Sequence, residues 1–178
     1  MHILLRTERL ILRPLTIDDL ASVHDYASDL ENTKLMMFLP NETIEETKEF
    51  LTKVTDEWNK ETPSFYEFGI IRNDILIGSI GIDLNEARTE GELGWILNKA
   101  YWRNGYTKEA AMAIKDFAIN KLKLKRLFAH CDIANTGSYR VMEAIGLTRI
   151  SDDQIRYNKS SKTPSYELCY ELKVEDII

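Results

Sequence analysis

Cysteine is scarce in this chain of 178 residues, which holds only Cys131 and Cys169, far apart in the sequence. The two do not form a CxxC pair, and no group of histidines and cysteines has the spacing of zinc ligands. Both are therefore expected to be reduced thiols packed in strands, and no bound metal is expected.

Long hydrophobic runs are also missing. No apolar run approaches the roughly 18 residues that would span a bilayer, and the segment 1–9 reaches charged side chains too early for the core of a signal peptide. Hydrophobic residues make up 44% and charged residues 29% of the chain, as in ordinary soluble globular proteins. The sequence therefore predicts a cytoplasmic protein without a membrane partner, folded as a single domain over residues 1–178.

An excess of basic residues is absent as well, because 29 acidic residues stand against 23 basic ones, a formal net charge of −6. Binding to nucleic acid favours a basic surface that releases counterions from phosphates, so this composition argues against a nucleic-acid partner. An acidic surface is compatible with a cationic small molecule or a basic peptide. The simpler interpretation is that the charge only keeps the protein soluble.

Glycine is limited to eight residues, and two nucleotide-binding fingerprints are missing: GxGxxG, and GxxxxGK followed by Ser or Thr. The chain has instead a strand-rich centre between helical segments. Strands are expected over 7–15, 65–72, 75–84, 89–97, 126–132 and 166–172. Helices are expected to begin at Thr16 and Thr43 and to cover 107–121 and 136–145. The polar stretch 151–164 is expected to be an exposed hairpin, and this order favours a mixed α/β sheet over a regular alternation.

The segment 92–110 is the first of two that suggest chemistry. A strand leads through a short loop that contains Gly105 into an alanine-rich helix. Loop N–H groups and the positive end of the helix dipole would meet there, which makes a seat for phosphate, and Arg103 and Lys108 flank it. The alternative is a plain strand-to-helix turn that needs Gly105 only for its dihedral angles.

The segment 135–147 is the second. Asn135 is expected to cap a short helix by accepting a hydrogen bond from the Ser138 N–H, and Gly146 is expected to end that helix. This structural interpretation accounts for Asn135 and Gly146 but leaves Ser138 and Tyr139 without a task.

Together these segments resemble the GNAT superfamily of N-acetyltransferases, in particular its ribosomal-protein N-terminal acetyltransferase (RimJ/RimL-like) branch. The resemblance covers nearly the whole chain and is carried, in this order, by residues 7–14, 77–81, 92–95, 101–110, 135–138 and 146–147. It implies an α/β (α+β) fold: a mixed, mostly antiparallel twisted sheet of six to seven strands flanked by about four helices.

The resemblance implies acetyl-CoA as the acetyl donor. The pyrophosphate loop of the family, Q/R-x-x-G-x-G/A, falls on residues 102–107, where Gly105 matches while Trp102 and Thr107 depart from the pattern. In the family the preceding strand splays from its neighbour and pairs with the pantetheine arm. The implied donor-binding residues are Trp95, Ile96, Leu97, Arg103, Asn104, Gly105, Tyr106, Thr107, Lys108, Asn135 and Ser138.

The resemblance also implies direct transfer from the thioester to an amine. Glu92 is the candidate base, acting through water. The alternative is that Glu92 is an exposed strand residue or an anchor for the substrate ammonium. Ser138 is the candidate group for the departing thiolate, with Tyr139 in reserve. His24 and His130 are interpreted as packed or surface residues. The stretch 36–38 (Met-Met-Phe) is either core or lining of the acceptor pocket.

The expected function is therefore an acetyl-CoA-dependent N-acetyltransferase that acts on a primary amine, either a protein or peptide N-terminus or a small amine. An α-amino group is modestly favoured over lysine, because its lower pKa makes it easier to deprotonate. One alternative is a non-catalytic acyl-CoA-binding or sensing module on the same fold. Another is an acetyltransferase for polyamines, amino sugars or drugs. The protein is expected to be a monomer or homodimer.

Overall fold

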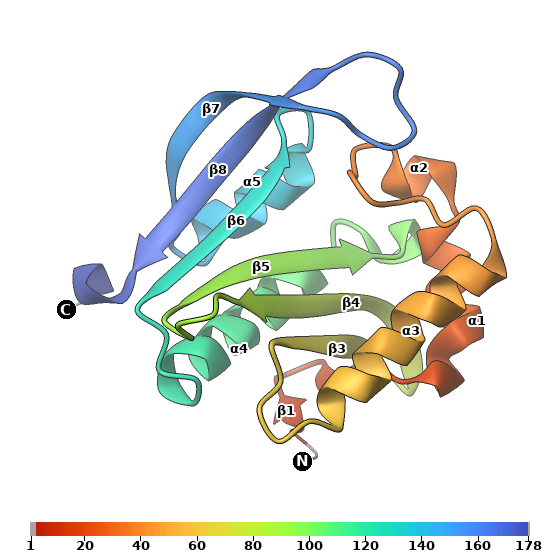
Figure 1. Ribbon diagram of the computed structural model, residues 1–178, viewed down its shortest axis with the longest axis horizontal. Helices are drawn as coiled ribbons and strands as arrows, with labels where there is room; N and C mark the ends of the chain where they lie inside the picture. The colour runs from red at the N-terminus through yellow and green to blue at the C-terminus, as the bar shows by residue number, and fades with distance from the viewer. Residues whose placement is uncertain (1–2, 178) are drawn as a thin grey trace.

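A computed structural model describes residues 3–177, so Met1, His2 and Ile178, which belong to the domain expected over 1–178, lie outside the described residues. The strands form one eight-stranded sheet in the order β1-β2-β3-β4-β5-β6-β8-β7 (Figure 1). Neighbouring strands are antiparallel except β5 and β6, which run parallel. The expected mixed, mostly antiparallel sheet is confirmed, with one strand more than the upper estimate.

The described elements have the following bounds. The strands are β1 (Leu5–Arg6), β2 (Ile11–Pro14), β3 (Phe65–Arg72), β4 (Ile75–Leu84), β5 (Glu90–Leu97), β6 (Arg126–Asp132), β7 (Thr148–Arg156) and β8 (Ser165–Lys173). The α-helices are α1 (Leu20–Ala27), α2 (Leu30–Thr33), α3 (Ile44–Trp58), α4 (Tyr106–Asn120) and α5 (Thr136–Ala144). Short 3₁₀ turns cover Ile17–Asp19, Lys99–Tyr101 and Val174–Ile177.

Local sequence signals set many of these boundaries. At the start of α3, the Thr43 hydroxyl accepts from the Glu46 N–H, and the Glu46 carboxylate accepts from the Thr43 N–H. Asn73 and Asp74 have positive φ angles of 48° and 63°, which suit a tight hairpin between β3 and β4. Gly146 has a φ of 96° just after α5, as expected for a residue that ends a helix.

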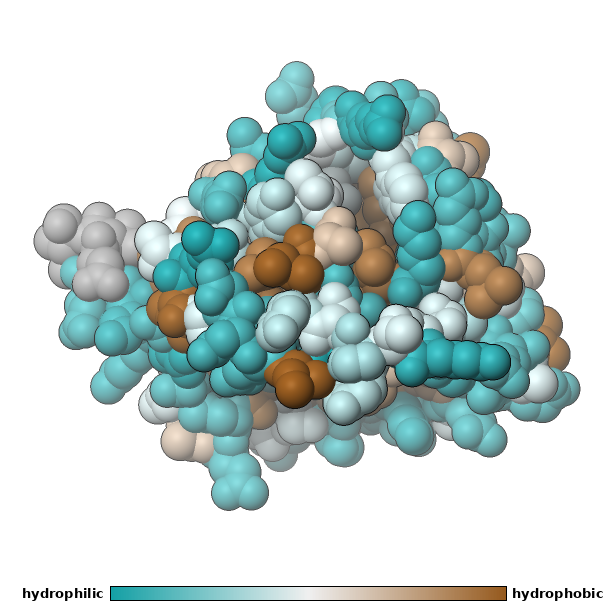
Figure 2. Space-filling view, turned by 90° about the horizontal axis from the view of Figure 1, so that it is seen from above, coloured by the Kyte–Doolittle hydropathy of each residue, from teal (hydrophilic) through white to brown (hydrophobic). Residues whose placement is uncertain are grey.

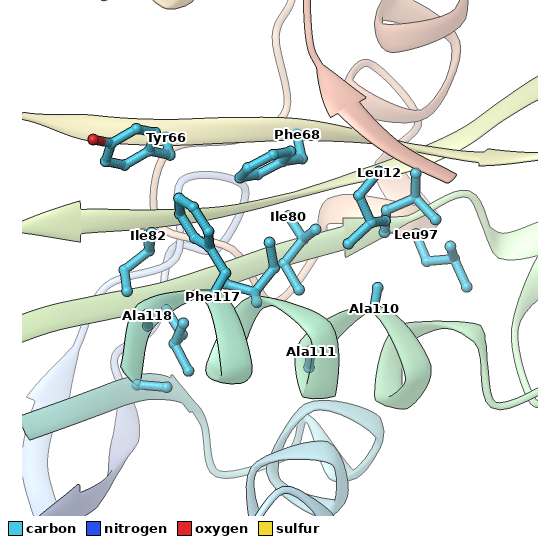
Figure 3. Packing of buried hydrophobic residues seen from close by; sticks show 14 of the residues in the cluster. Leu12, Tyr66, Phe68, Ile80, Ile82, Leu97, Ala110, Ala111, Phe117 and Ala118 are labelled. Atoms are coloured by element: carbon cyan, nitrogen blue, oxygen red, sulfur yellow. The ribbon is translucent and has the colours of Figure 1, made fainter. Parts of the chain in front are cut away.

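The hydrophobic core lies between the sheet and α4. Figure 3 shows Phe117 of α4 facing Phe68 and Ile80 of the strands, and the rings of Phe68 and Phe117 meet edge to face at 5.7 Å. The opposite face of β3 and β4 carries Glu67 and Ser79, because side chains alternate along a strand. Helices α1 and α3 lie on that opposite side, in front of the sheet in Figure 1. The two faces of β3 and β4 therefore differ in chemistry.

Gly78 allows β4 and β5 to approach closely. A Cβ atom at Gly78 would lie 2.9 Å from the Leu97 Cα and would overlap the Ile96 carbonyl oxygen. Any larger residue would push the end of β5 away. A glycine inside a strand typically marks a bulge or a close backbone approach, and here it is the latter.

One sequence expectation needs correction. The segment 7–15 is not one strand, because the Thr7 N–H donates to the Leu10 carbonyl and turns the chain between β1 and β2. The segment 151–164 belongs to an exposed antiparallel hairpin, as expected, although its first strand, β7, begins earlier, at Thr148. Helix α2 was not predicted at all. Cys131 and Cys169 are buried free thiols in β6 and β8, as expected.

None of the helices within residues 3–177 is long and apolar enough to cross a membrane.

Candidate active site

The pairing of β5 with β6 stops partway along both strands. It is limited to three pairs, in which Glu90, Gly91 and Glu92 face residues 126–128. Beyond Glu92 the two strands diverge, as Figure 1 shows, while β5 stays paired to β4 as far as Leu97. Within the described residues, the outer edge of β5 beyond Glu92 therefore has no strand partner.

The expected donor-binding residues Trp95, Ile96 and Leu97 lie on this unpaired part of β5. Trp95 and Ile96 are half-buried, and Leu97 is buried against the core. The Leu97 carbonyl accepts a hydrogen bond of 2.9 Å from the Trp102 indole N–H. Trp102 thus ties the following loop to the end of the strand, which gives this departure from the family pattern a structural task.

The loop at residues 102–107 is held by its own side chains. Gly105 is the N-cap of α4 and has a φ of 78°, a left-handed conformation that favours glycine. The Asn104 side-chain amide donates to the carbonyls of Tyr101 and Trp102 at 3.1 and 2.9 Å. No acceptor among residues 3–177 meets the main-chain N–H groups from Arg103 to Lys108. The loop and the first turn of α4 therefore present a set of free donors, which is the arrangement that binds phosphate.

Basic side chains surround this loop. Arg103 and Lys108 are exposed, as expected of residues that flank an anion site. Arg9, which sequence reasoning missed, donates from Nη1 to the Asn104 carbonyl at 3.0 Å and pairs with Glu109 at 2.6 Å. Arg9 lies 100 residues from Glu109 in the sequence, so no local signal could have placed it here.

Tyr106 is the buried residue of this loop. Its ring lies under two guanidinium groups, those of Arg9 at 4.6 Å and Arg72 at 5.1 Å from the ring centroid. Thr107 is half-buried beside it, in the first turn of α4. Tyr106 therefore connects the loop to the N-terminal hairpin and to the end of β3.

Asn135 and Ser138 lie at the start of α5. The Asn135 side-chain oxygen accepts from the Ser138 N–H at 3.1 Å, so the predicted cap is present. The Ser138 hydroxyl lies near the Cys131 thiol and opposes the effect of burial, which raises the pKa of Cys131 to about 11. Tyr139 instead lines a surface pocket with Glu143 and Tyr170, between α5 and the outer strands. The side chains of Ser138 and Tyr139 thus lie in different places, the first beside Cys131 of β6 and the second in the surface pocket.

Glu92 is in direct contact with His130. A hydrogen bond of 3.0 Å joins His130 Nδ1 to Glu92 Oε1, and both side chains are partly exposed. The hydrogen bond to Glu92 raises the pKa of His130 above its usual value, against the opposing effect of burial. Since Glu92 pairs with Phe128, His130 lies on the same face, two residues farther toward the divergence of the strands.

His130 is a partly exposed strand residue packed against Phe128, which agrees with its interpretation as a packed or surface residue, and it also adjoins the candidate base. The two residues are 38 positions apart, and only the parallel register brings them together. His24, by contrast, forms a packing contact: its Nδ1 lies 2.8 Å from the Thr47 hydroxyl, between α1 and α3.

The loop between α2 and α3 is joined to the β7–β8 connection. Arg156 donates to the Leu35 carbonyl at 3.1 Å, and the Lys159 N–H donates to the Met36 carbonyl at 3.0 Å. Phe38 is 83% exposed and Met36 is half-buried, so this stretch is not core, which was one of its two expected roles. Figure 2, which looks down on the molecule from above the view of Figure 1, shows a mostly hydrophilic face with small hydrophobic groups between.

Comparison with known proteins gives a consistent result. Residues 9–148 match the model of the Acetyltransferase (GNAT) domain. A protein of Bacillus subtilis (strain 168), named "Uncharacterized N-acetyltransferase YnaD", is 34% identical over 152 residues, which are 84% of each chain. The crystal structure of a GNAT-family acetyltransferase from Bacillus anthracis superposes with a TM-score of 0.83 at 30% identity, over 97% of this chain and 99% of the other.

A more distant similarity concerns the fold alone. A RimL ribosomal L7/L12 α-N-protein acetyltransferase, solved in complex with coenzyme A, has a TM-score of 0.83 at 13% identity. The similarity covers 97% of this chain and 99% of that one. The same architecture therefore accommodates coenzyme A in that protein.

Proposed function

Because this chain belongs to the GNAT family of acetyltransferases, and is thus an acyltransferase, we propose that it transfers an acetyl group from acetyl-CoA directly to a primary amine. The observation that carries the proposal is the end of β5–β6 pairing at Glu92, on the strand that leads into a loop of free N–H donors. An unpaired strand edge and an anion seat together match a long donor with a phosphate group at one end and an amide-containing arm.

On this proposal each part of the site has a role in donor binding. The N–H groups from Arg103 to Lys108 bind the pyrophosphate, assisted by the exposed charges of Arg103 and Lys108. Trp95, Ile96 and Leu97 offer main-chain groups to the pantetheine arm. Asn135 and Ser138 contribute from the start of α5.

The reaction follows from the position of Glu92. The amine nitrogen attacks the thioester carbonyl, a C–N bond forms and the C–S bond breaks. The amine loses a proton to Glu92 through a water molecule, while the thiolate gains a proton and leaves as the thiol. Ser138 stabilises the thiolate. The His130 contact orients Glu92 toward the divergence of the strands.

The acceptor is a primary amine, on a peptide N-terminus or on a small molecule. A free α-amino group has a pKa near ~8, against ~10.4 for lysine, so more of it is unprotonated at neutral pH. Main-chain donors on the free edge of β5 suit the oxyanion that develops on the thioester carbonyl. Positioning and oxyanion stabilisation supply the largest part of the rate.

A thiol-release assay with acetyl-CoA and a panel of peptides and small amines tests this function. We expect amine-dependent release of CoA, together with a product heavier by one acetyl group. Binding of acetyl-CoA without release for any amine would indicate the alternative, a non-catalytic acyl-CoA-binding module. Absence of both binding and release would contradict the whole proposal.

A further inference from the structure

Glu67 of β3, which has no place in the site described so far, directs its carboxylate across β4. A Cβ atom at Gly81 would overlap Glu67 Oε2, so the glycine leaves the space that this carboxylate occupies. In the register of the sheet, Glu67 faces Gly81, and Gly81 faces Gly94 of β5. A Cβ atom at Gly94 would meet nothing within 4 Å, and Gly94 is exposed. The cross-strand row of Glu67, Gly81 and Gly94 therefore leads from a half-buried carboxylate to the open surface beside Glu92.

Asp83 connects Glu67 with Glu92. Asp83 is partly exposed and lies opposite Glu92 in the β4–β5 register. Partial burial raises the pKa of Asp83, and the charges of Glu92 and Glu57 raise it further. Burial and the charge of Asp83 raise the pKa of Glu67 to about 8, although the Ser79 hydroxyl acts in the opposite direction. Carboxylates from three neighbouring strands thus share one face.

The cationic side chains near these carboxylates already have other partners. Lys60 pairs with Glu57, Arg13 pairs with Asp19, and His130 is bound to Glu92. Among residues 3–177, neither Glu67 nor Asp83 has an ion-pair partner. A buried carboxyl without a cation is costly to ionise, and such groups gather at functional sites.

Tyr26 of α1 supplies an independent observation. Its side chain is only 2% exposed, and its hydroxyl has no hydrogen-bond partner among the described residues. This hydroxyl neighbours Ser79, and burial together with the charge of Glu67 raises its pKa. Buried hydroxyls are nearly always hydrogen-bonded in folded proteins. The Ser79 hydroxyl adjoins both Tyr26 and Glu67 but has a single hydrogen to donate, so this pair leaves hydrogen-bonding capacity for a polar ligand.

We propose that Glu67 and Asp83 bind a second positive charge on the acceptor, and that the acceptor is a small linear molecule with at least two amino groups. One amine is placed at Glu92 for reaction, and the other is held by the Glu67 carboxylate, with Tyr26 and Ser79 beside it. Strands lie about 4.8 Å apart, and Glu67 reaches over Gly81 of β4. Its carboxylate therefore lies about one strand and two residues from Glu92, within reach of a short diamine. This inference rests on the proposed acetyltransferase function and selects its substrate class.

The kinetic test compares butane-1,4-diamine with butylamine, which differs from it by the second amine. In the wild type we expect kcat/KM for the diamine to exceed that for the monoamine by about tenfold or more, as a charge-assisted contact provides. Glu67→Gln should reduce this ratio to near one. Asp153→Asn, which removes an exposed charge of the same sign on β7, should leave the ratio unchanged. Circular dichroism of each variant checks the fold.

A second measurement needs no turnover. Calorimetry of diamine binding near pH 7, in two buffers with different ionisation enthalpies, reports protons released on binding. A bound ammonium lowers the pKa of Glu67, so the wild type should release a proton and Glu67→Gln should not. Diamine binding with proton release but no thiol release from any amine would refute the proposed function and leave this site standing.

Two results would overturn the inference itself. The first is thiol release in which butylamine, or a neutral tripeptide amide with a single α-amine, is as good an acceptor as the diamine. The second is diamine binding with the same proton release in wild type and Glu67→Gln.

Discussion

At the scale of single residues, the candidate site depends on carboxylates whose neighbours differ. Glu92 has a histidine partner at 3.0 Å, whereas Glu67 has none and is half-buried. Burial without a cationic partner raises the pKa of Glu67 to about 8. Two acids with opposed environments on one face can hold a cation and accept a proton without duplicating each other.

Replacing Glu92 by Gln tests its contact with His130. The carboxylate raises the pKa of the imidazole, so we expect the pKa of His130 to fall in Glu92→Gln. Titration of the imidazole signals by NMR measures this shift, and the His24 signals in the same spectra provide the control. The activity of this variant should fall at neutral pH and recover partly near pH 9, where the amine deprotonates unaided. A higher acceptor KM with an unchanged pH profile would show an anchor instead of a base.

Ser138→Ala is expected to lower kcat more than it raises the KM for acetyl-CoA. A group that stabilises a developing thiolate acts mainly on the transition state, so its loss appears in turnover. Steady-state kinetics with a working acceptor measures both constants, and Thr136→Ala, at the exposed start of the same helix, is the matched control. An unchanged kcat in Ser138→Ala would show that another group stabilises the thiolate.

Glu67→Gln should change how stability depends on pH. In the wild type the folded state keeps the Glu67 proton up to about pH 8, whereas the unfolded chain loses it near ~4.3. Between these values the folded state binds more protons, so this residue makes stability fall as pH rises and has no further effect above about pH 8. The variant should lose less stability than wild type between pH 5 and pH 8. Thermal unfolding at several pH values measures the difference, and parallel curves for the two proteins would contradict the burial of this acid.

At the scale of elements, the features that can be predicted well from the sequence are the local ones, such as the ends of helices. Thr43, Asn135 and Gly146 act within one helix turn, and each does in the structure what its residue type indicates. The bounds of β7 in the expected hairpin have no local signal, because an edge strand needs no buried face: seven of its nine residues are exposed, including Ile155 at 64%. The contacts of Glu92 with His130 and of Arg9 with Glu109 depend on register and topology, which no local pattern encodes.

The loop before α4 is the element on which donor binding is expected to depend. Gly105→Val places a branched side chain at a φ of 78° and among the free N–H groups, so we expect CoA to bind at least tenfold more weakly. Gly105→Ala should have a smaller effect, because a Cβ atom there would meet only Arg9 Nη2, at 3.5 Å. Calorimetry with CoA gives the dissociation constants. Equal dissociation constants for folded Gly105→Val and wild type would show that this loop does not bind the phosphates of CoA.

At the scale of the whole molecule, Arg156 connects the outer strands with the helical side. It is 7% exposed and binds Glu167 at 2.9 Å, Asn158 at 2.8 Å and the Leu35 carbonyl. Asn158 in turn donates to Asp132 at 2.6 Å, at the end of β6. One buried guanidinium therefore fixes the β7–β8 connection against the loop after α2.

Arg156→Met should destabilise the protein by about 3 kcal/mol, since it leaves Glu167 as a half-buried carboxylate without its cation. Arg149→Met, on the same strand but with an exposed ion pair at 3.6 Å, should cost less than about 1 kcal/mol. Urea unfolding measures both values. An equal effect of the two substitutions on stability would show that the buried cluster contributes little.

The three-residue seam between β5 and β6 has a mechanical consequence. The sheet consists of two parts, β1 to β5 on one side and β6, β8 and β7 on the other. They are hinged where Glu90, Gly91 and Glu92 pair with β6. Beyond that hinge no ladder hydrogen bond joins the two parts, and the contacts of the β7–β8 connection with the loop after α2 limit how far they can tilt. A ligand that fills the opening and bonds to both sides adds a second connection, so its binding stiffens the sheet as well as supplying the reactive group.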